Sequence, residues 1–265
     1  MTATSHEPTK NSRRPRVLPG TQLELAEVAR FPLKRRGRGG KRAGAGRKRA
    51  PGTRPSVPHR PRPHHHGAKP VLVTLRALRG LPSLRKERVN NMLRDVLRRQ
   101  RDRGYAKIFQ VVEFTIQDDH LHFIVEATGI RETGMKDAPE ALRSGVSGLV
   151  ISFAKQLNKL LGRRGKVWGD RFHSRELGSP TEVRNALVYV FRNLARHGTA
   201  IFGDENVDQL SSAPRFTHFK RPVFSIYADA EWPEARPRTW LLGVGWWKKT
   251  RGGPLDPNEV RRMGK

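Results

Sequence analysis

The sequence contains no cysteine, few acidic residues and no long apolar run. Without thiols the chain cannot form disulfides, thiolate zinc sites or a cysteine nucleophile, so a bound metal must use His, Asp, Glu, Asn or Gln. No apolar stretch approaches the roughly 18–20 residues that cross a bilayer. The N-terminus is basic but lacks the hydrophobic segment of a secretory signal. We therefore expect a cytoplasmic, nucleoid-associated protein with no membrane partner.

The charge of the chain is strongly one-sided, with 53 Lys+Arg against 24 Asp+Glu and a net charge of +29. Such a charge opposes compaction unless a polyanion neutralises it, which indicates a nucleic-acid partner. Residues 1–69 alone carry 18 Lys+Arg and 3 acids, with few apolar residues to bury. We predict a disordered basic tail that binds phosphates without reading sequence. The alternative is a merely solubilising tail, and its histidine triplet, residues 64–66, is interpreted as incidental.

Residues 70–198 show the alternating periodicities of strands and helices. Strand patterns cover 70–76, 107–117, 120–127 and 165–177, and helical patterns cover about 84–103, 139–162 and 180–197. The last helix opens with Ser179 and Glu182 at capping-box spacing. This order predicts an α+β, ferredoxin-like split βαβ fold with a central antiparallel sheet and one additional helix. Residues 199–265, rich in Pro, Gly and Trp, form a C-terminal extension without clear periodicity.

Two histidines lie in the strand predicted at 120–127. Because side chains alternate along a strand, His120 and His122 project from one face, about 7 Å apart along the chain. Two imidazoles at this spacing can converge on one cation. The spacing alone is a weak signal in a chain with ten histidines. A pair of surface histidines is the alternative interpretation.

Tyr189 lies off the core face of the last predicted helix. In a helical projection, its direction is about 120° from the apolar stripe, and Asn193 follows one turn later on the same side. The apolar stripe consists of Val183, Ala186, Leu187, Val190 and Leu194. A tyrosine hydroxyl is suited to attack on a phosphodiester, and a nearby metal stabilises the developing charge. The alternative is a tyrosine that lies flat across the helix and covers the edge of the core.

Three segments together resemble a known family. His120-Leu121-His122 resembles the His-hydrophobic-His (HUH) motif. Residues 166–175, Lys-Val-Trp-Gly-Asp-Arg-Phe-His-Ser-Arg, resemble the Trp-x-x-Arg-Phe segment of the REP-associated tyrosine transposases. The stretch from Tyr189 to Asn193 resembles the Tyr-x-x-x-Asn-Pro motif of that family. Asp119 and Leu194 depart from the pattern, because the family usually has Asn and Pro at these positions.

The resemblance to these HUH-type, single-tyrosine transposases implies a specific chemistry. It implies a divalent metal ion, Mg²⁺ or Mn²⁺, on His120 and His122, with Asn193 as a third ligand. It also implies Tyr189 as the nucleophile that nicks and rejoins single-stranded or hairpin DNA through a 5′-phosphotyrosine intermediate. Members of the family act as homodimers or as monomers. The alternative function is a non-catalytic nucleic-acid-binding protein derived from the same fold.

Basic side chains cluster between the last two predicted helices. We expect the DNA backbone to contact Lys166, Arg171, His173 and Arg175. Trp168 can stack on a base or belong to the core, and Phe172 is expected in the core. The tryptophans of the extension, Trp240, Trp246 and Trp247, either pack on the domain or grip single-stranded DNA. The sequence leaves both choices open for these four tryptophans.

Overall fold

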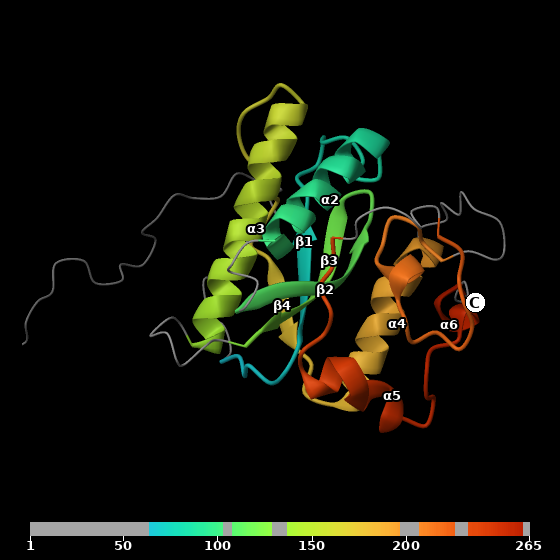
Figure 1. Ribbon diagram of the computed structural model, residues 1–265. Coiled ribbons are helices and arrows are strands. Elements are labelled where there is room, and N and C mark those ends of the chain that lie inside the picture. Colours follow the sequence, from blue (N-terminus) through green and yellow to red (C-terminus); the bar gives the residue numbers. More distant parts are fainter. Residues whose placement is uncertain (1–63, 103–107, 129–136, 197–206, 226–232, 262–265) are drawn as a thin grey trace, which may run out of the picture. The chain divides into compact units, whose positions relative to one another are not determined.

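The computed structural model describes residues 64–102, 108–128, 137–196, 207–225 and 233–261, without the side chains of 193–196 and 261. All of them belong to one compact unit that covers residues 55–265. The predicted tail therefore lies outside the described residues up to position 63. The elements, shown in Figure 1, are β1 (Val71–Arg76), α2 (Glu87–Asp102), β2 (Phe109–Ile116), β3 (His120–Ala127), α3 (Ala138–Leu160), β4 (His173–Glu176), α4 (Pro180–Arg196), α5 (Trp246–Lys248) and α6 (Pro257–Arg261).

Four strands form one antiparallel sheet in the order β2-β3-β1-β4. β2 and β3 form a hairpin, which a tight turn at 117–119 closes with a bond from Gln117 N to His120 O of 2.9 Å. β1 lies inside the sheet, between β3 and β4. The connection from β1 to β2 therefore crosses over β3 and contains α2, and the connection from β3 to β4 crosses over β1 and contains α3. The predicted mixed fold with a central antiparallel sheet is confirmed at this level.

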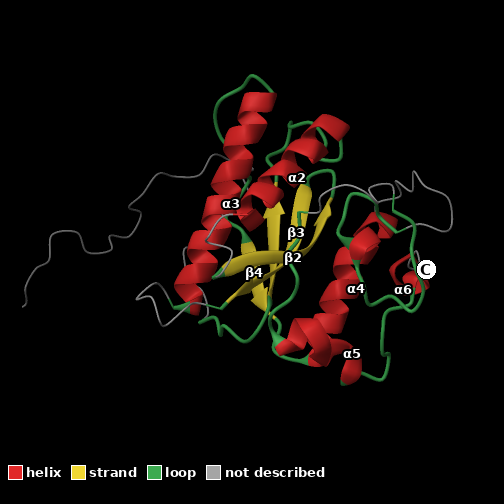
Figure 2. Cartoon of the chain, viewed as in Figure 1, coloured by secondary structure: helices red, strands yellow, loops and turns green. Residues whose placement is uncertain are grey.

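Helices α2 and α3 cover one face of the sheet, and α4 lies against the other (Figure 2). On the first face, strand alternation directs five apolar side chains into a core with α2 and α3. They are Val73, Leu75, Leu121, Phe123 and Val125. The helix α3 approaches β2 very closely, because a Cβ atom at Gly145 would lie only 2.1 Å from Cγ of Phe109. Glycine is therefore required at this crossing.

Helix α4 and the C-terminal segment build a second core on the other face. Four members of the predicted α4 stripe are confirmed, because Val183, Ala186, Leu187 and Val190 are buried, and the side chain of Leu194 lies outside the described part. Ser179 caps this helix, since its Oγ accepts from Glu182 N at 3.2 Å. In the C-terminal segment, Trp246 is fully buried in this core and Trp247 packs against it. Two of the three tryptophans thus pack on the domain, whereas Trp240 is 54% exposed.

A buried carboxylate fastens the C-terminal segment to the sheet. Glu126 of β3 accepts four hydrogen bonds of 2.7–2.8 Å: from Gln110 Nε2, Arg238 N, Thr239 N and Thr239 Oγ1. These donors satisfy both carboxylate oxygens and hold the start of the helical stretch that leads to Trp246. The same segment lies along the edge of β2, where Phe114 O accepts from Ser212 N at 2.9 Å and Val111 O accepts from Ala235 N at 2.9 Å.

The structured part begins before the predicted position 70. His65 is buried and contacts Ala127 O through Nε2 (3.1 Å) and Glu176 Oε2 through Nδ1 (3.3 Å). Burial lowers the pKa of His65, although the contacts with Ala127 and Glu176 act in the opposite direction. Burial disfavours the charged form of Glu176, but Lys69 and His66 outweigh it and lower the pKa of this carboxyl to about 2. The interpretation of this histidine triplet as incidental was wrong.

Two element boundaries differ from the prediction. The strand expected at 165–177 is only His173–Glu176, because Gly165 takes a φ of +105° and the chain arches before it joins the sheet. Trp168 holds the arch, residues 165–172, against the first core. Its side chain is buried there, and its Nε1 donates to Val150 O at 3.0 Å. Trp168 therefore belongs to the core, and Phe172 packs against it as expected. The helix predicted from 84 begins at Glu87, since the Ser83 hydroxyl accepts from Arg85 N and holds a turn.

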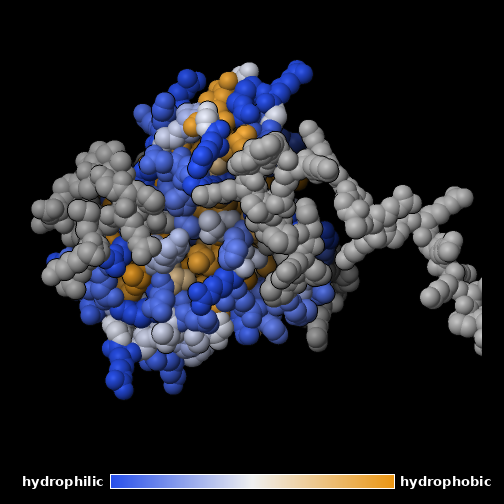
Figure 3. All heavy atoms as spheres, turned by 180° about the vertical axis from the view of Figure 1, so that it is seen from behind, coloured by the Kyte–Doolittle hydropathy of each residue, from blue (hydrophilic) through white to orange (hydrophobic). Residues whose placement is uncertain are grey.

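The face seen in Figure 3 is mostly hydrophilic where the structure describes it, with smaller hydrophobic patches in between. Across the described residues we find no helix with the length and hydropathy needed to span a bilayer.

Candidate active site

The sheet face that carries α4 holds both predicted histidines. Across the strands, Thr115 of β2 pairs with His122 of β3, His122 with Thr74 of β1, and Thr74 with His173 of β4. In an antiparallel sheet, paired residues project from the same face, so these four side chains form one row. Arg76 and His120 form the next row. These two polar rows lie next to the apolar side chains of Leu72 and Ile124 on the same face.

His122 contacts the protein through both ring nitrogens. It is only 3% exposed, with Nδ1 at 2.9 Å from Thr74 Oγ1 and Nε2 at 3.3 Å from the Tyr189 hydroxyl. In one tautomer Nδ1–H donates to Thr74, and the Nε2 lone pair then points toward Tyr189. In the other tautomer Thr74 donates to Nδ1 and Nε2–H donates to the phenol oxygen. Only the first tautomer leaves a lone pair on Nε2 that can bind a metal ion or accept a proton.

His120 is oriented by a carboxylate. Its Nδ1 lies 2.7 Å from Asp119 Oδ1, and the Arg76 guanidinium donates to Asp119 Oδ2 through Nε (3.2 Å) and Nη2 (3.0 Å). The bond to His120 is the main cause that lowers the pKa of Asp119, and Arg76 adds to it. An anionic partner at Nδ1 directs Nε2 of His120 outward as a basic ligand. Asp119 therefore orients the imidazole of His120.

Tyr189 extends from α4 toward the histidines. Its side chain is 36% exposed, and its ring is perpendicular to that of His122 at a centroid distance of 5.0 Å. The His120 and His122 rings lie 4.8 Å apart. The hydroxyl thus meets an imidazole nitrogen instead of covering the core edge, and the structure brings Tyr189, His120 and His122 together.

The donor set fits a divalent metal ion in part. Both imidazoles bond to protein oxygens through Nδ1, an arrangement typical of histidine ligands that coordinate through Nε2. Within the described residues, no group of three or more His, Asp or Glu side chains is placed to hold a metal ion. Asn193, the expected third ligand, lies in α4, but its side chain is outside the part that the structure describes.

The predicted DNA contacts divide into two groups. His173 and Arg175 alternate along the short edge strand β4 and project, exposed, from the face that carries His122. Arg175 also donates to Glu182 Oε1 at 3.0 Å. Lys166 and Arg171 lie in the arch before β4, also exposed, and the Lys166 ammonium donates to Gly169 O at 2.6 Å. Only the first group lies on the sheet face of the histidines, and within it only His173 shares the row of His122.

Thr74 is the site residue that the sequence did not reveal. It is the direct partner of His122 across β1 and β3, and the contact depends on the register between strands far apart in the chain. The only local signal was its place as a polar residue among apolar neighbours in 71–75.

The chain matches no protein-family model and no curated protein sequence. Among solved structures, it is similar to a REP-associated tyrosine transposase bound to a REP hairpin, with a TM-score of 0.42 and 18% sequence identity. The match covers 59% of this chain and 83% of that one. The likeness is a distant structural one, too distant to assign a function.

Proposed function

We propose that this protein cuts and rejoins single-stranded DNA with Tyr189 as the nucleophile. The observation that carries the proposal is the 3.3 Å contact between the Tyr189 hydroxyl and His122 Nε2, on a sheet face with a second oriented imidazole. The net charge of +29 supports a DNA substrate. The strand order and the two crossover helices support a ferredoxin-like arrangement in which α4 is the additional helix.

In the proposed reaction the Tyr189 oxygen attacks the scissile phosphorus. The bond from phosphorus to the 3′-oxygen breaks, which leaves a 5′-phosphotyrosine on the protein and a 3′-hydroxyl on the departing strand. The phenolic proton leaves to water, and the 3′-oxygen takes up a proton in turn. Attack by a 3′-hydroxyl on the phosphotyrosine rejoins the DNA and restores the phenol, so no external energy source is consumed.

The histidines would hold the metal ion through Nε2, with Asn193 as a third ligand. A bound Mg²⁺ or Mn²⁺ would withdraw negative charge from the scissile phosphate. Thr74 and Asp119 fix the tautomers by accepting the Nδ1–H protons of His122 and His120. His173 and Arg175, on the same face, contact the DNA backbone in this proposal, and Lys166 and Arg171 extend that contact along the arch.

The test is formation of a covalent protein–DNA adduct. The full chain is incubated with Mn²⁺ and hairpin oligonucleotides labelled at either end, and adducts are separated by denaturing electrophoresis. The Tyr189→Phe variant should lose the adduct by at least about a thousand-fold, as expected on removal of a nucleophile. Tyr227→Phe is the matched control, because it makes the same substitution at another of the three tyrosines of the chain. An adduct that persists in Tyr189→Phe, or that never forms with the native chain, would overturn the proposal.

A second candidate is a non-catalytic nucleic-acid-binding protein with this fold. It is favoured by the lack of a three-residue His, Asp or Glu group for a metal among the residues that the structure describes. This candidate expects salt-sensitive DNA binding that stays unchanged when His120 and His122 become Ala, and no adduct. The adduct assay therefore separates the two functions.

A further inference from the structure

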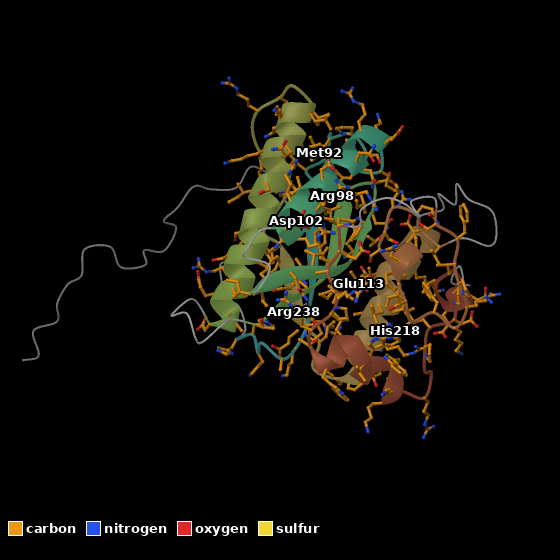
Figure 4. All side chains as sticks on the ribbon, in the orientation of Figure 1. Met92, Arg98, Asp102, Glu113, His218 and Arg238 are labelled. Carbon is orange, nitrogen blue, oxygen red and sulfur yellow. The ribbon has the colours of Figure 1, made fainter. Side chains whose placement is uncertain are left out.

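A pocket of about 930 Å³ lies at the β2 edge of the sheet, away from the row of histidines. β2 contributes Glu113 to its wall, and the C-terminal segment contributes Ser212, residues 214–223 and Glu234 (Figure 4 labels Glu113 and His218). Glu113 lies two residues before Thr115, the pairing partner of His122, and therefore projects from the same sheet face. The proposed cleavage reaction uses none of these pocket residues.

Glu113 is a buried carboxyl whose hydrogen bonds are incomplete. Its side chain is 8% exposed, and its one donor among the described residues is the Ser212 hydroxyl, at 2.5 Å from Oε2. Glu126, a structural glutamate on the neighbouring strand, receives four donors. A carboxyl group has two acceptor oxygens, so Glu113 can accept further hydrogen bonds beside the one from Ser212. Glu113 thus has an acceptor to offer to a ligand.

A second carboxyl faces the same pocket. Glu234 is largely buried, and its Oε2 has no hydrogen-bond partner among the described residues. Burial raises the pKa of Glu113 well above its usual range, and the nearby Glu234 raises it further. The pKa of Glu234 is also raised by burial. The two carboxyls together therefore present acceptor oxygens to one pocket.

Aromatic rings and cations surround these acceptors. Phe216, His218 and Phe219 line the pocket and pack against one another, with ring centroids 5.1 Å apart for Phe216 and Phe219. Half-buried rings of this kind offer flat faces on which a base can stack. Exposed Lys220 and Arg236 lie at the same pocket and can neutralise phosphates. Rings, cations and acceptors in one pocket match the parts of a nucleotide.

We propose that this pocket binds one unpaired DNA base that carries an exocyclic amino group, namely cytosine, adenine or guanine, and rejects thymine. The amino group has two hydrogens for the two carboxyl acceptors, whereas thymine offers one ring N–H and no amino group. The proposal rests on DNA being the substrate. A base held here lies on the sheet face that α4 and Tyr189 cover. Its binding would help to select which phosphodiester reaches the nucleophile.

The test measures binding without cleavage. The full chain is titrated, in the presence of EDTA, against fluorescent oligothymidylate carrying a single central dC, dA or dG, and against oligothymidylate alone. Native protein should bind each amino-bearing probe about ten-fold more tightly than the all-thymine probe. Glu113→Met should remove this preference, because Met fills a similar volume without an acceptor. Glu87→Met, the same change at an exposed glutamate of α2, should keep it.

A change in the probe tests the same contact without altering the protein. Replacement of the adenine by purine removes the amino group and keeps the ring, so the native chain should lose about the same ten-fold. The proposal is overturned if purine binds as tightly as adenine, if a folded Glu113→Met keeps the preference, or if the native chain shows none. Because no metal is present, the base preference and the Tyr189 adduct fail independently.

Discussion

The hydrogen bond between Thr74 and His122 allows a sharp test of how the proposed site is organised. Thr74→Val keeps the β-branched shape in the central strand and removes the oxygen that lies 2.9 Å from Nδ1. A hydrogen bond of this kind contributes about 0.5–1.5 kcal/mol net, and loss of such an outer partner lowers metal affinity or activity about 10–100-fold. Since Thr74 is only half-buried, we expect a loss of stability below about 1 kcal/mol.

The assay is adduct formation as a function of Mn²⁺ concentration. We expect the half-saturating Mn²⁺ concentration to rise about ten-fold in Thr74→Val, while the adduct yield at saturating metal recovers. Thr181→Val makes the same chemical change at an exposed position of α4 and should leave the midpoint unchanged. If the Mn²⁺ midpoint of a folded Thr74→Val stays at the native value, Thr74 does not set the tautomer of His122 and the proposed organisation is incorrect.

Two further predictions concern stability. The pKa of Glu176 is lowered from 4.5 to about 2, so its ionised form stabilises the folded state above pH 4.5. This contribution to the free energy of unfolding is up to about 3 kcal/mol. It is lost as the pH falls toward 2. Urea unfolding should therefore show a deficit for Glu176→Gln at pH 6 that shrinks to nothing near pH 2, and a deficit that does not depend on pH would contradict this assignment. Gly145→Ala should destabilise the protein by about 1–3 kcal/mol, because the new methyl overlaps the Phe109 ring. Gly148→Ala in the same helix meets nothing within 4 Å and should stabilise it by up to about 1 kcal/mol, so thermal melting that ranks the two variants the other way would refute the packing argument.

Local patterns were sufficient for the parts of the fold that depend on neighbours in sequence. The alternation in 120–127 correctly placed His120 and His122 on one face, and the stripe of α4 correctly left Tyr189 outside the core. Both predictions used only the periods of a strand and a helix. These periods could not predict the distance between strand β3 and helix α4, because the register of β1, β3 and β4 sets that distance.

The rest of the site depended on contacts between distant segments. Thr74 and His122 are 48 residues apart, and His65 and Glu176 are 111 apart. The second core was also hidden, because residues 207–225 and 233–260 form short turns and helices whose apolar residues follow no single period. The boundary of the extension at residue 198 stays a prediction, although the described part of the extension packs against α4 and the sheet.

The attachment of the C-terminal segment to β2 bears on how this sheet avoids self-association. A free edge strand offers unpaired N–H and C=O groups to other chains and invites aggregation. Here Ser212 and Ala235 occupy backbone groups of Phe114 and Val111 along the β2 edge, and the opposite edge strand is only four residues long and carries His173 and Arg175. A chain that ended at residue 198 would uncover these backbone groups of the β2 edge. The segment beyond α4 therefore covers backbone groups that a free β2 edge would offer to another chain.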